Sequence, residues 1–245
     1  LGGITVIATD KTGTLTKNEM RVTRVWIQDT SYHVNELSPV STNQVLQKLV
    51  TAGAVCNNAS LAPVQDHGSF DVIGDKTEGA LLLLAQHVGI DYVIQKKNGT
   101  LIEEYAFDPT TKSMSVVWKD ATGTHLHCKG APEAILSKST HIITKDGEKE
   151  LTQKEKATIT RAFSEFASEG LRVIAIATKR ITWSHQARHT AENGLTFLGF
   201  VGISDPPRME VATAIKRASE AGIRTIMITG DNELTALAIA KQIGL

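Results

Sequence analysis

The two ends of the chain share one sequence pattern, and the middle follows another. An apolar, β-branched run from Gly3 to Thr9 ends in a polar turn that begins at Asp10. At the other end, strand-like and helix-like runs alternate over residues 196–204, 209–221, 223–228 and 233–243. Because strands and helices alternate at lengths typical of βαβ units, both ends are predicted to contribute to one parallel, Rossmann-like sheet.

The middle of the chain mixes helices with hairpin-like strands. Helical spacing covers residues 41–56 and 77–88, and a helix opened by the capping box of Thr152 and Glu155 is predicted to end before Gly170. Strand-like runs cover residues 113–119, 124–129 and 171–178, and the first two are joined by a turn at 121–123. Hairpins mixed with helices indicate an antiparallel α+β unit.

The simplest account of the two patterns is one domain inserted into another. We predict an α/β chain in which residues 19–197 form the inserted α+β domain, built on an antiparallel sheet. Residues 1–18 and 198–245 then form a discontinuous, incomplete Rossmann-like domain. Because the chain begins with a strand already under way, we expect it to be a piece of a longer protein.

The balance of charged residues limits the kinds of ligand that the chain is expected to bind. Lys plus Arg equals Asp plus Glu at 26 each, so no long-range field attracts nucleic acid or anionic lipid. A small anionic ligand held by a few local charges remains compatible with this balance. The two cysteines, Cys56 and Cys128, make no disulfide framework, and no apolar run is long enough to cross a bilayer.

Asp10 carries the clearest chemical signal. It follows an apolar strand, so it would lie at the carboxyl end of a parallel sheet, where such folds bind ligands. A carboxylate there can attack a phosphoryl group and hold it as an acyl phosphate. Gly13 permits a sharp turn, and Thr12 and Thr14 offer hydroxyl and amide groups to phosphate oxygens. Taken alone, an Asp-Lys-Thr-Gly turn after a strand is also an ordinary connection.

The run from Asp10 to Thr16 resembles the phosphorylation signature of P-type ATPases. Six further strings resemble motifs of that family, in the family's order: Lys76–Leu81, Phe107–Val116, Lys129–Glu133, Gly170–Val173, Asp205–Arg208 and Met227–Asn232. Each short string is weak evidence alone, but the ordered set covers the whole chain. The chain is therefore identified as a member of the P-type cation-transporting ATPases, of the haloacid-dehalogenase-like superfamily. Residues 19–197 would be the nucleotide-binding domain, and the two ends part of the phosphorylation domain.

The resemblance implies an ATP site in the inserted domain. Phe107 would stack on adenine, and Glu78 would accept a hydrogen bond from the adenine amino group. Lys129 supplies a cation beside Gly130, which gives close backbone access. The resemblance adds Lys112, Met114, Arg172 and Arg208 to the nucleotide site. Without the surrounding motifs, Phe107 would be a packing aromatic and Glu78 an acid favoured at a helix start.

The resemblance also implies transfer of the γ-phosphoryl group of ATP to Asp10, with Lys11 in the same loop. Mg²⁺ would be held by the Asp10 carboxylate and the Thr12 carbonyl. Thr229, Gly230 and Asp231 lie at a strand-to-helix junction, whose amides suit an anion. Asp231 could also be only the N-cap of that helix, and we expect both roles. The chain stops at Leu245, before the family's phosphate-binding lysine and second magnesium carboxylate.

Some positions depart from the family pattern. Lys76 stands where the family usually has Pro, and Pro109 or Thr111 stands where it often has Arg, so the pocket is expected to depend more on Lys112. His125 and His127 alternate along a predicted strand, point to one face and could chelate a metal. No third ligand is evident, and two half-exposed strand residues are the plainer interpretation.

Two other function classes compete with an ion pump. A soluble phosphatase or phosphomutase of the same superfamily generally has Asp two residues after the nucleophile, whereas this chain has Thr12, which cannot activate water. A non-catalytic nucleotide-binding module is the other alternative. A Walker-type NTPase is excluded, because no Gly-x4-Gly-Lys-Ser/Thr string occurs.

The resemblance also sets expectations for the parent protein. The strings at 129–133 and 205–208 look like those of the calcium, sodium and proton pumps, and a calcium pump is the first expectation. The chain would be a cytoplasmic domain of an integral membrane protein. Its partners would be ATP or ADP and the transmembrane and actuator domains of the same parent, with no nucleic acid. The transported cation would bind elsewhere, in intramembrane carboxylates, so this sequence does not name it.

Overall fold

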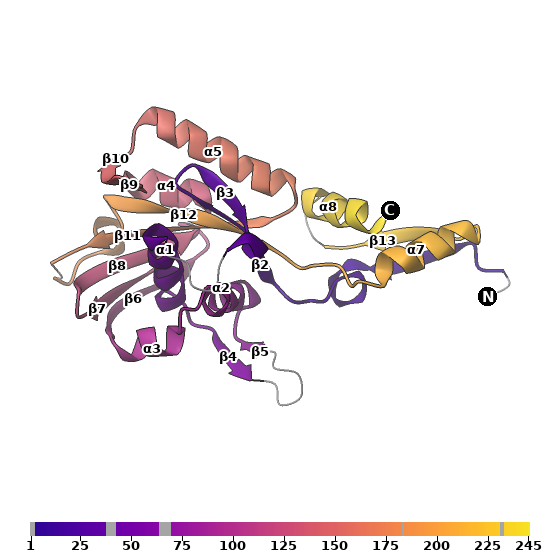
Figure 1. Ribbon diagram of the computed structural model, residues 1–245, viewed down its shortest axis with the longest axis horizontal. Coiled ribbons are helices and arrows are strands. Elements are labelled where there is room, and N and C mark those ends of the chain that lie inside the picture. Colours follow the sequence, from indigo (N-terminus) through magenta and orange to yellow (C-terminus); the bar gives the residue numbers. More distant parts are fainter. Residues whose placement is uncertain (1–2, 38–42, 64–69, 183, 231–232) are drawn as a thin grey trace.

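The computed structural model describes residues 3–37, 43–63, 70–182, 184–230 and 233–245. These form a larger part built on a broad sheet and a smaller part at the end of the molecule that carries both termini (Figure 1). Two segments link the parts and run antiparallel: the amide of Lys17 donates to the carbonyl of Pro206 (3.0 Å), and that of Arg208 donates to Leu15 (2.9 Å). Within the described residues, no helix is long and apolar enough to span a membrane.

The larger part contains a nine-stranded sheet. Seven strands follow one another in the order β10 (Gly147–Glu150), β9 (Ser139–Thr144), β12 (Leu195–Ser204), β11 (Arg172–Arg180), β8 (Gly123–Gly130), β7 (Ser113–Asp120) and β6 (Thr100–Asp108). In addition, β2 (Arg21–Ile27) pairs with both β12 and β3 (Thr30–His33). All pairs are antiparallel except β12 with β9. The predicted antiparallel sheet and its hairpin at β7 and β8 are confirmed.

Helices cover both faces of this sheet (Figure 1). One apolar cluster lies under α1 (Gln44–Val55), α2 (Lys76–His87) and α3 (Tyr92–Lys97). The other lies under α4 (Pro132–Lys138), α5 (Gln153–Ser168) and α6 (Arg188–Ala191). A separate hairpin, β4 (Ser60–Pro63) with β5 (Phe70–Ile73), packs against α2, and a short 3₁₀ helix covers Val34–Glu36. The predicted capping box of Thr152 and Glu155 opens α5 as expected.

Strand β12 separates the two clusters. Phe197 and Phe200 enter the cluster under α5, whereas Leu198 and Val201 enter the cluster under α1. At Gly199 a Cβ would lie 2.3 Å from the carbonyl oxygen of Trp26, so only glycine allows β2 to approach this closely. The sequence predicted this strand, but its assignment to the parallel sheet is wrong. A strand that is apolar on both faces is typical of parallel sheets, and here the same pattern serves a central antiparallel strand covered by helices on both sides.

The smaller part brings the chain ends together. β1 (Val6–Asp10) pairs in parallel with β13 (Arg224–Ile228), and α7 (Val211–Glu220) and α8 (Glu233–Ile243) pack against them. The predicted parallel pairing of the two ends is therefore observed, but as a two-stranded sheet. A complete Rossmann-like sheet stays a prediction. Val6, Ile226 and Ile228 are exposed.

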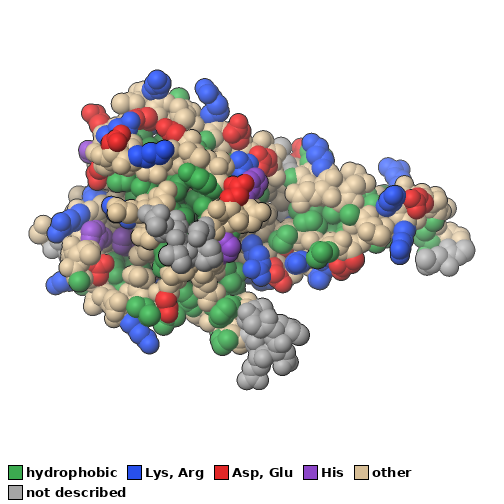
Figure 2. Space-filling model, viewed as in Figure 1, with side chains coloured by type: hydrophobic (Ala, Val, Ile, Leu, Met, Phe, Trp, Pro, Cys, Tyr) green, Lys and Arg blue, Asp and Glu red, His purple; other side chains and the backbone are tan. Residues whose placement is uncertain are grey.

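Acidic and basic side chains are interspersed over the face of the molecule shown in Figure 2, and neither sign dominates a large area. This distribution agrees with the equal counts of acidic and basic residues in the sequence. Electrostatic recognition must therefore be local, at particular cavities.

Candidate functional site

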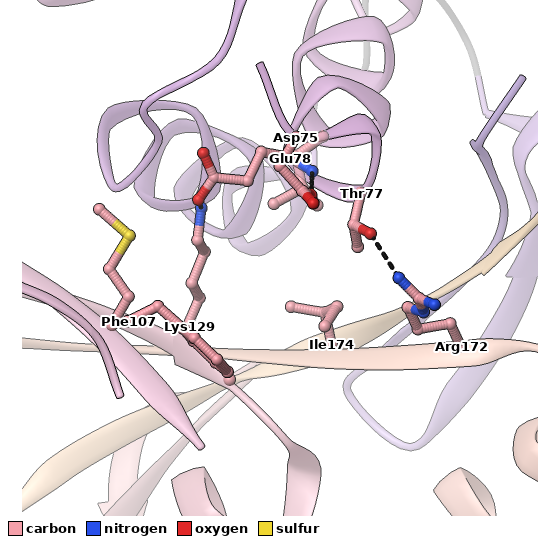
Figure 3. A pocket seen from close by; sticks show the side chains of 10 residues that line it. Asp75, Thr77, Glu78, Phe107, Lys129, Arg172 and Ile174 are labelled. Atoms are coloured by element: carbon pink, nitrogen blue, oxygen red, sulfur yellow. Dashed lines mark hydrogen bonds and ion pairs between the residues drawn. The ribbon is translucent and has the colours of Figure 1, made fainter. Parts of the chain in front are cut away.

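A cavity of about 440 Å³ lies between the first turn of α2 and the face formed by β7, β8 and β11 (Figure 3). Its lining is Asp75, Thr77, Glu78, Leu81, Phe107, Met114, Lys129, Gly130, Arg172 and Ile174. Six of the eight residues that the sequence predicted for the nucleotide site are in this set. We refer to it as the α2 cavity.

The α2 cavity has a charged wall made by Glu78 and Lys129. The Lys129 ammonium donates to Glu78 Oε1 at 2.6 Å, and the amide of Asn58 donates to Glu78 Oε2 at 2.8 Å. Only 8% of the Lys129 side chain and 18% of the Glu78 side chain are exposed, so the pair is largely shielded from water. Asp75 caps α2 by accepting the amide of Glu78 (3.0 Å), which fixes the start of the helix and the position of this carboxylate.

The remaining walls are mostly apolar. Met114 is buried, and Leu81 of α2 and Ile174 of β11 add apolar side chains to the lining. Phe107 stands at the edge with 62% of its surface exposed, an unusual position for a phenyl ring that covers nothing. An apolar cavity with one flat aromatic side chain and one donor–acceptor pair suits a planar, hydrogen-bonding ligand such as a purine base.

Arg172 lies at the end of the cavity opposite Phe107 (Figure 3). Its Nη1 donates to the hydroxyl of Thr77 at 2.8 Å, and its side chain is otherwise exposed. Arg172 also lines a second cavity, of about 330 Å³, which reaches Lys11, Asp205 and Gly230 at the junction of the two parts. Arg172 therefore lines both the α2 cavity and the cavity that contains Lys11 and Gly230.

Two predicted nucleotide residues do not line the α2 cavity. The Lys112 ammonium lies on the Glu133 carboxylate at 3.3 Å, on the exposed surface, while the Lys112 carbonyl accepts the amide of Ala131. Arg208 donates to the carbonyls of Gly13 (2.8 Å) and Thr14 (3.2 Å), so it binds the loop that follows Asp10.

Asp10 ends β1 and is paired in register with Ile228, which ends β13. Thr229 and Gly230 therefore follow directly on the neighbouring strand, as parallel pairing requires, whereas Asp231 lies outside the described residues. After Asp10 the chain turns tightly, with Gly13 at φ 78°. Asp10 and Thr12 are exposed, and Lys11 is buried. The Asp10 carboxylate and the turn carbonyls are hard oxygen donors of the kind that Mg²⁺ prefers.

Asp205 holds the two linking segments together. Its carboxylate accepts the hydroxyl of Thr16 at 2.5 Å and the amide of Glu19 at 3.0 Å, and the residue is almost fully buried. Thr16 in turn accepts the amide of Gly13 (3.2 Å), so the same contacts fix the loop after Asp10. The sequence drew attention to this motif but assigned a role only to Arg208.

The two cysteines are poor nucleophiles. Burial raises the pKa of the Cys56 thiol to about 11, despite the opposing charge of Lys129, and burial also raises the pKa of Cys128 well above its ordinary value. Both thiols stay protonated near neutral pH. Cys56 lies beneath Met114, to whose carbonyl oxygen its sulfur donates at 3.6 Å, so it forms part of the support of the α2 cavity.

His125 and His127 lie on one face of β8 with their rings stacked at 5.9 Å, as their alternation predicted. Each is half-buried, and Nδ1 of His127 lies 3.0 Å from the hydroxyl of Thr178. Across the described part of the chain, no three His, Cys, Asp or Glu side chains gather as metal ligands would.

Several residues around the α2 cavity were not anticipated. Thr77 binds Arg172, Asp75 caps α2, and Asn58 binds Glu78. Asp75 precedes a helix start and could have been found as an N-cap. Asn58 and Thr77 carry no local signal, because their roles depend on contacts between segments distant in sequence.

Comparison with known proteins identifies the family to which the chain belongs. The model of the P-type ATPase cytoplasmic domain N matches residues 45–210, and the chain belongs to this family. It is 38% identical to a calcium-transporting ATPase of Bacillus subtilis and 36% identical to calcium-transporting ATPase 1 of Saccharomyces cerevisiae. It is 33% identical to the endoplasmic reticulum calcium ATPase srcA of Aspergillus fumigatus. In each case the whole chain is aligned, and it spans 29%, 27% and 31% of the relative's length, respectively.

Proposed function

We propose that this chain is the cytoplasmic catalytic region of an ATP-driven cation pump that forms an acyl phosphate on Asp10. The observation that carries the proposal is the convergence of residues from four separate motifs on the α2 cavity. Glu78 comes from α2, Phe107 from β6, Lys129 from β8 and Arg172 from β11. These residues lie far apart in the sequence, and the fold brings them to one cavity.

The chemistry of the cavity suits adenine. Phe107 offers an exposed ring face for stacking, and Met114 offers an apolar surface. Glu78 can accept from an exocyclic amino group while Lys129 donates to a ring nitrogen, so the pair matches the edge of adenine. Because Glu78 and Lys129 already neutralise each other, the base would insert beside an existing ion pair and no buried charge would be left alone.

Arg172 sets the direction of the phosphates. Its guanidinium lies at the far end of the α2 cavity, and the residue also lines the second cavity with Lys11 and Gly230. A guanidinium suits phosphate oxygens because its donors form a planar fork. The γ-phosphoryl group would then reach Asp10 when the two parts close, and motion at the linking segments would supply the approach.

At Asp10 the chain provides a nucleophile and an anion site. The carboxylate oxygen attacks the γ-phosphorus, the bond to the bridging oxygen of ADP breaks, and ADP leaves with that electron pair. Thr229 and Gly230 follow β13 at the strand-to-helix junction beside Asp10, where they would contact the transferred group. Asp10 and the Thr12 carbonyl would hold Mg²⁺, which lowers the repulsion between carboxylate and phosphate.

The parent's remaining properties follow from the same proposal. The names of the relatives make calcium the first candidate for the transported cation, although one relative, at 32% identity, is a sodium/potassium exporting ATPase of Schizosaccharomyces pombe. The chain would act as a cytoplasmic domain of an integral membrane protein, together with transmembrane and actuator domains of the same parent. Thr12 in place of a second aspartate argues against a phosphatase.

Calorimetric titration with MgATP and MgADP tests the nucleotide site. We expect the chain to bind both, and Phe107→Ala to weaken ATP binding by about tenfold or more, because stacking on an aromatic ring contributes roughly 1–3 kcal/mol. The matched control is Phe70→Ala, which removes a partly exposed phenyl ring on β5 outside the cavity. Equal affinity of Phe107→Ala and Phe70→Ala would overturn the assignment of the base site.

A further inference from the structure

The strand that carries Phe107 has an irregularity at that residue. Tyr105 pairs with Ser115 and Asp108 pairs with Ser113, so two residues of β6, Ala106 and Phe107, face the single residue Met114 of β7. Such a bulge re-aims the side chains of the bulged strand and interrupts the ladder. The bulge therefore places Phe107 at the edge of the α2 cavity.

Arg188 of α6 donates hydrogen bonds to both strands at the bulge. Its Nη1 donates to the carbonyl of Ala106 at 2.9 Å, and its Nη2 donates to the carbonyl of Ser113 at 2.6 Å and to the Ser113 hydroxyl at 3.1 Å. One guanidinium thus joins the end of β6 to the start of β7 across the base of the turn at 109–112. The planar fork of arginine makes this double contact possible, and lysine cannot reproduce it.

Glu192 fixes the guanidinium in place. Its carboxylate is 2% exposed and accepts from Arg188 Nε (2.8 Å), from the Ser115 hydroxyl (2.7 Å) and from the Lys138 ammonium. Burial by itself would raise the pKa of Glu192, but the hydrogen bonds of Lys138 and Ser115 and the two positive charges lower it below its ordinary value. Glu192 is therefore ionised, and its charge keeps Arg188 oriented toward β6.

On the β8 side, the turn at 109–112 is held by contacts between backbone atoms and not by a side chain. The amide of Ala131 donates to the Lys112 carbonyl at 3.0 Å, and Gly130 packs directly against Lys112 and Ser113. Loss of Arg188 would thus leave the β8 side of the turn fixed and release the β6 side, which bears Phe107. None of the five side chains of this network, Arg188, Glu192, Lys138, Ser113 and Ser115, lines the α2 cavity.

We infer that Arg188, oriented by Glu192, is a positioning residue for the base site: it holds the β6 bulge in the conformation that presents Phe107 to the nucleotide base. The inference rests on the proposed function, because it concerns the affinity of the same cavity. It assigns a binding role to residues on the face of the sheet opposite α2, at α6, which neither the sequence motifs nor the cavity lining includes.

A double-mutant cycle with MgATP as the ligand tests this inference. We expect Arg188→Met to weaken binding on the order of tenfold, within the range expected for loss of stacking. In the Phe107→Ala background, the same change should weaken binding less than twofold, because the ring that it positions is already gone. Arg188→Lys, which keeps the charge for Glu192, should fold like the parent and give an intermediate loss. Arg161→Met, an exposed arginine of α5, is the control and should bind as the parent does.

Each result of the double-mutant cycle has one interpretation. If Phe107→Ala binds ATP like the parent, the proposed base site fails, whatever Arg188 does. If Phe107→Ala weakens binding but Arg188→Met and Arg188→Lys do not, or if their losses add fully to that of Phe107→Ala, the positioning role is overturned. If Arg188→Met does not fold, the cycle with Arg188→Lys decides between the same two results.

Discussion

At the scale of single residues, Glu78 and Lys129 are predicted to determine how the α2 cavity discriminates ligands. The two side chains present an acceptor and a donor side by side, and both are largely buried. Breaking a buried pair by removing one partner leaves an uncompensated charge, which is costly. Loss of either residue would therefore affect the empty protein as well as its ligand affinity, and substitution of Phe107, which is exposed, is the cleaner probe of the base site.

His127 is predicted to make stability depend on pH. Its ring stacks on His125 and lies against Thr178, and burial, followed by the nearby His125, lowers its pKa from 6.5 to about 4. The unfolded chain therefore binds a proton at this histidine more readily than the folded chain does. The contribution of His127 to the free energy of unfolding is fully present above pH 6.5 and is lost as pH falls toward 4. The loss at pH 4 is on the order of 3 kcal/mol.

Urea unfolding between pH 7 and pH 4 measures this effect. In His127→Gln, which retains a partner for Thr178, the free energy of unfolding should fall less steeply with pH than in the parent. His185→Gln is the matched control, because His185 is 85% exposed and its ring contacts the Glu103 carboxylate at the surface. Parallel curves for His127→Gln and the parent would show that His127 titrates normally.

At the scale of elements, the end of β8 supports the α2 cavity, because it packs against the turn at 109–112 and the start of β7. A Cβ on Gly130 would lie 2.2 Å from the Lys112 carbonyl oxygen and 2.8 Å from Ser113 Cα. Both neighbours are backbone atoms, so neither can move without shifting the turn that follows Phe107. The sequence predicted close backbone access at Gly130 for the nucleotide, and the structure gives that space to the protein's own chain.

Gly130→Ala should therefore lower both stability and ATP affinity. We expect a loss of about 1–3 kcal/mol in the free energy of unfolding, as for other overpacked sites, and weaker binding in calorimetric titration. The comparison variant is Gly53→Ala in α1, where the added Cβ would meet only side-chain ends, those of Ile176 at 3.1 Å and Leu81 at 3.7 Å, and alanine favours the helix. Full stability of Gly130→Ala would mean that the turn adapts more freely than its contacts indicate.

The elements also show what the sequence could and could not predict. The capping box of α5, the β7–β8 hairpin and the parallel pairing of the chain ends were predicted because each has a local pattern. The alternation in β6 is broken at the bulge, so neither this strand nor the role of Arg188 had a local signal. The pairing of β2 with β12 brings together residues more than 170 positions apart, and only the folded chain reveals it. Residues of the site were predicted from a family resemblance, since their spacing alone fits ordinary turns and helix starts.

At the scale of the whole molecule, the α2 cavity and Asp10 belong to different parts. The two parts are joined by the antiparallel linking segments, which Asp205 holds through Thr16 and Glu19. They also touch where the hydroxyl of Thr235 on α8 donates to the carbonyl of Gly170 after α5 (3.3 Å). Nucleotide binding and phosphoryl transfer are therefore predicted to be separable by substitution, although both act on one ATP molecule.

The separation can be tested in the full-length parent with γ-labelled ATP. Asp10→Asn should give no acid-stable, hydroxylamine-sensitive label, because an amide is not a nucleophile toward phosphorus. Its ATP affinity should equal or exceed that of the parent, because removing the carboxylate charge relieves repulsion with the γ-phosphate. Phe107→Ala should do the reverse: label should still form at saturating ATP, but the concentration for half-maximal labelling should rise about tenfold or more. Label on the Asp10→Asn protein would exclude Asp10 as the acceptor, and loss of label from Phe107→Ala at every ATP concentration would show that the two parts do not work as separable sites.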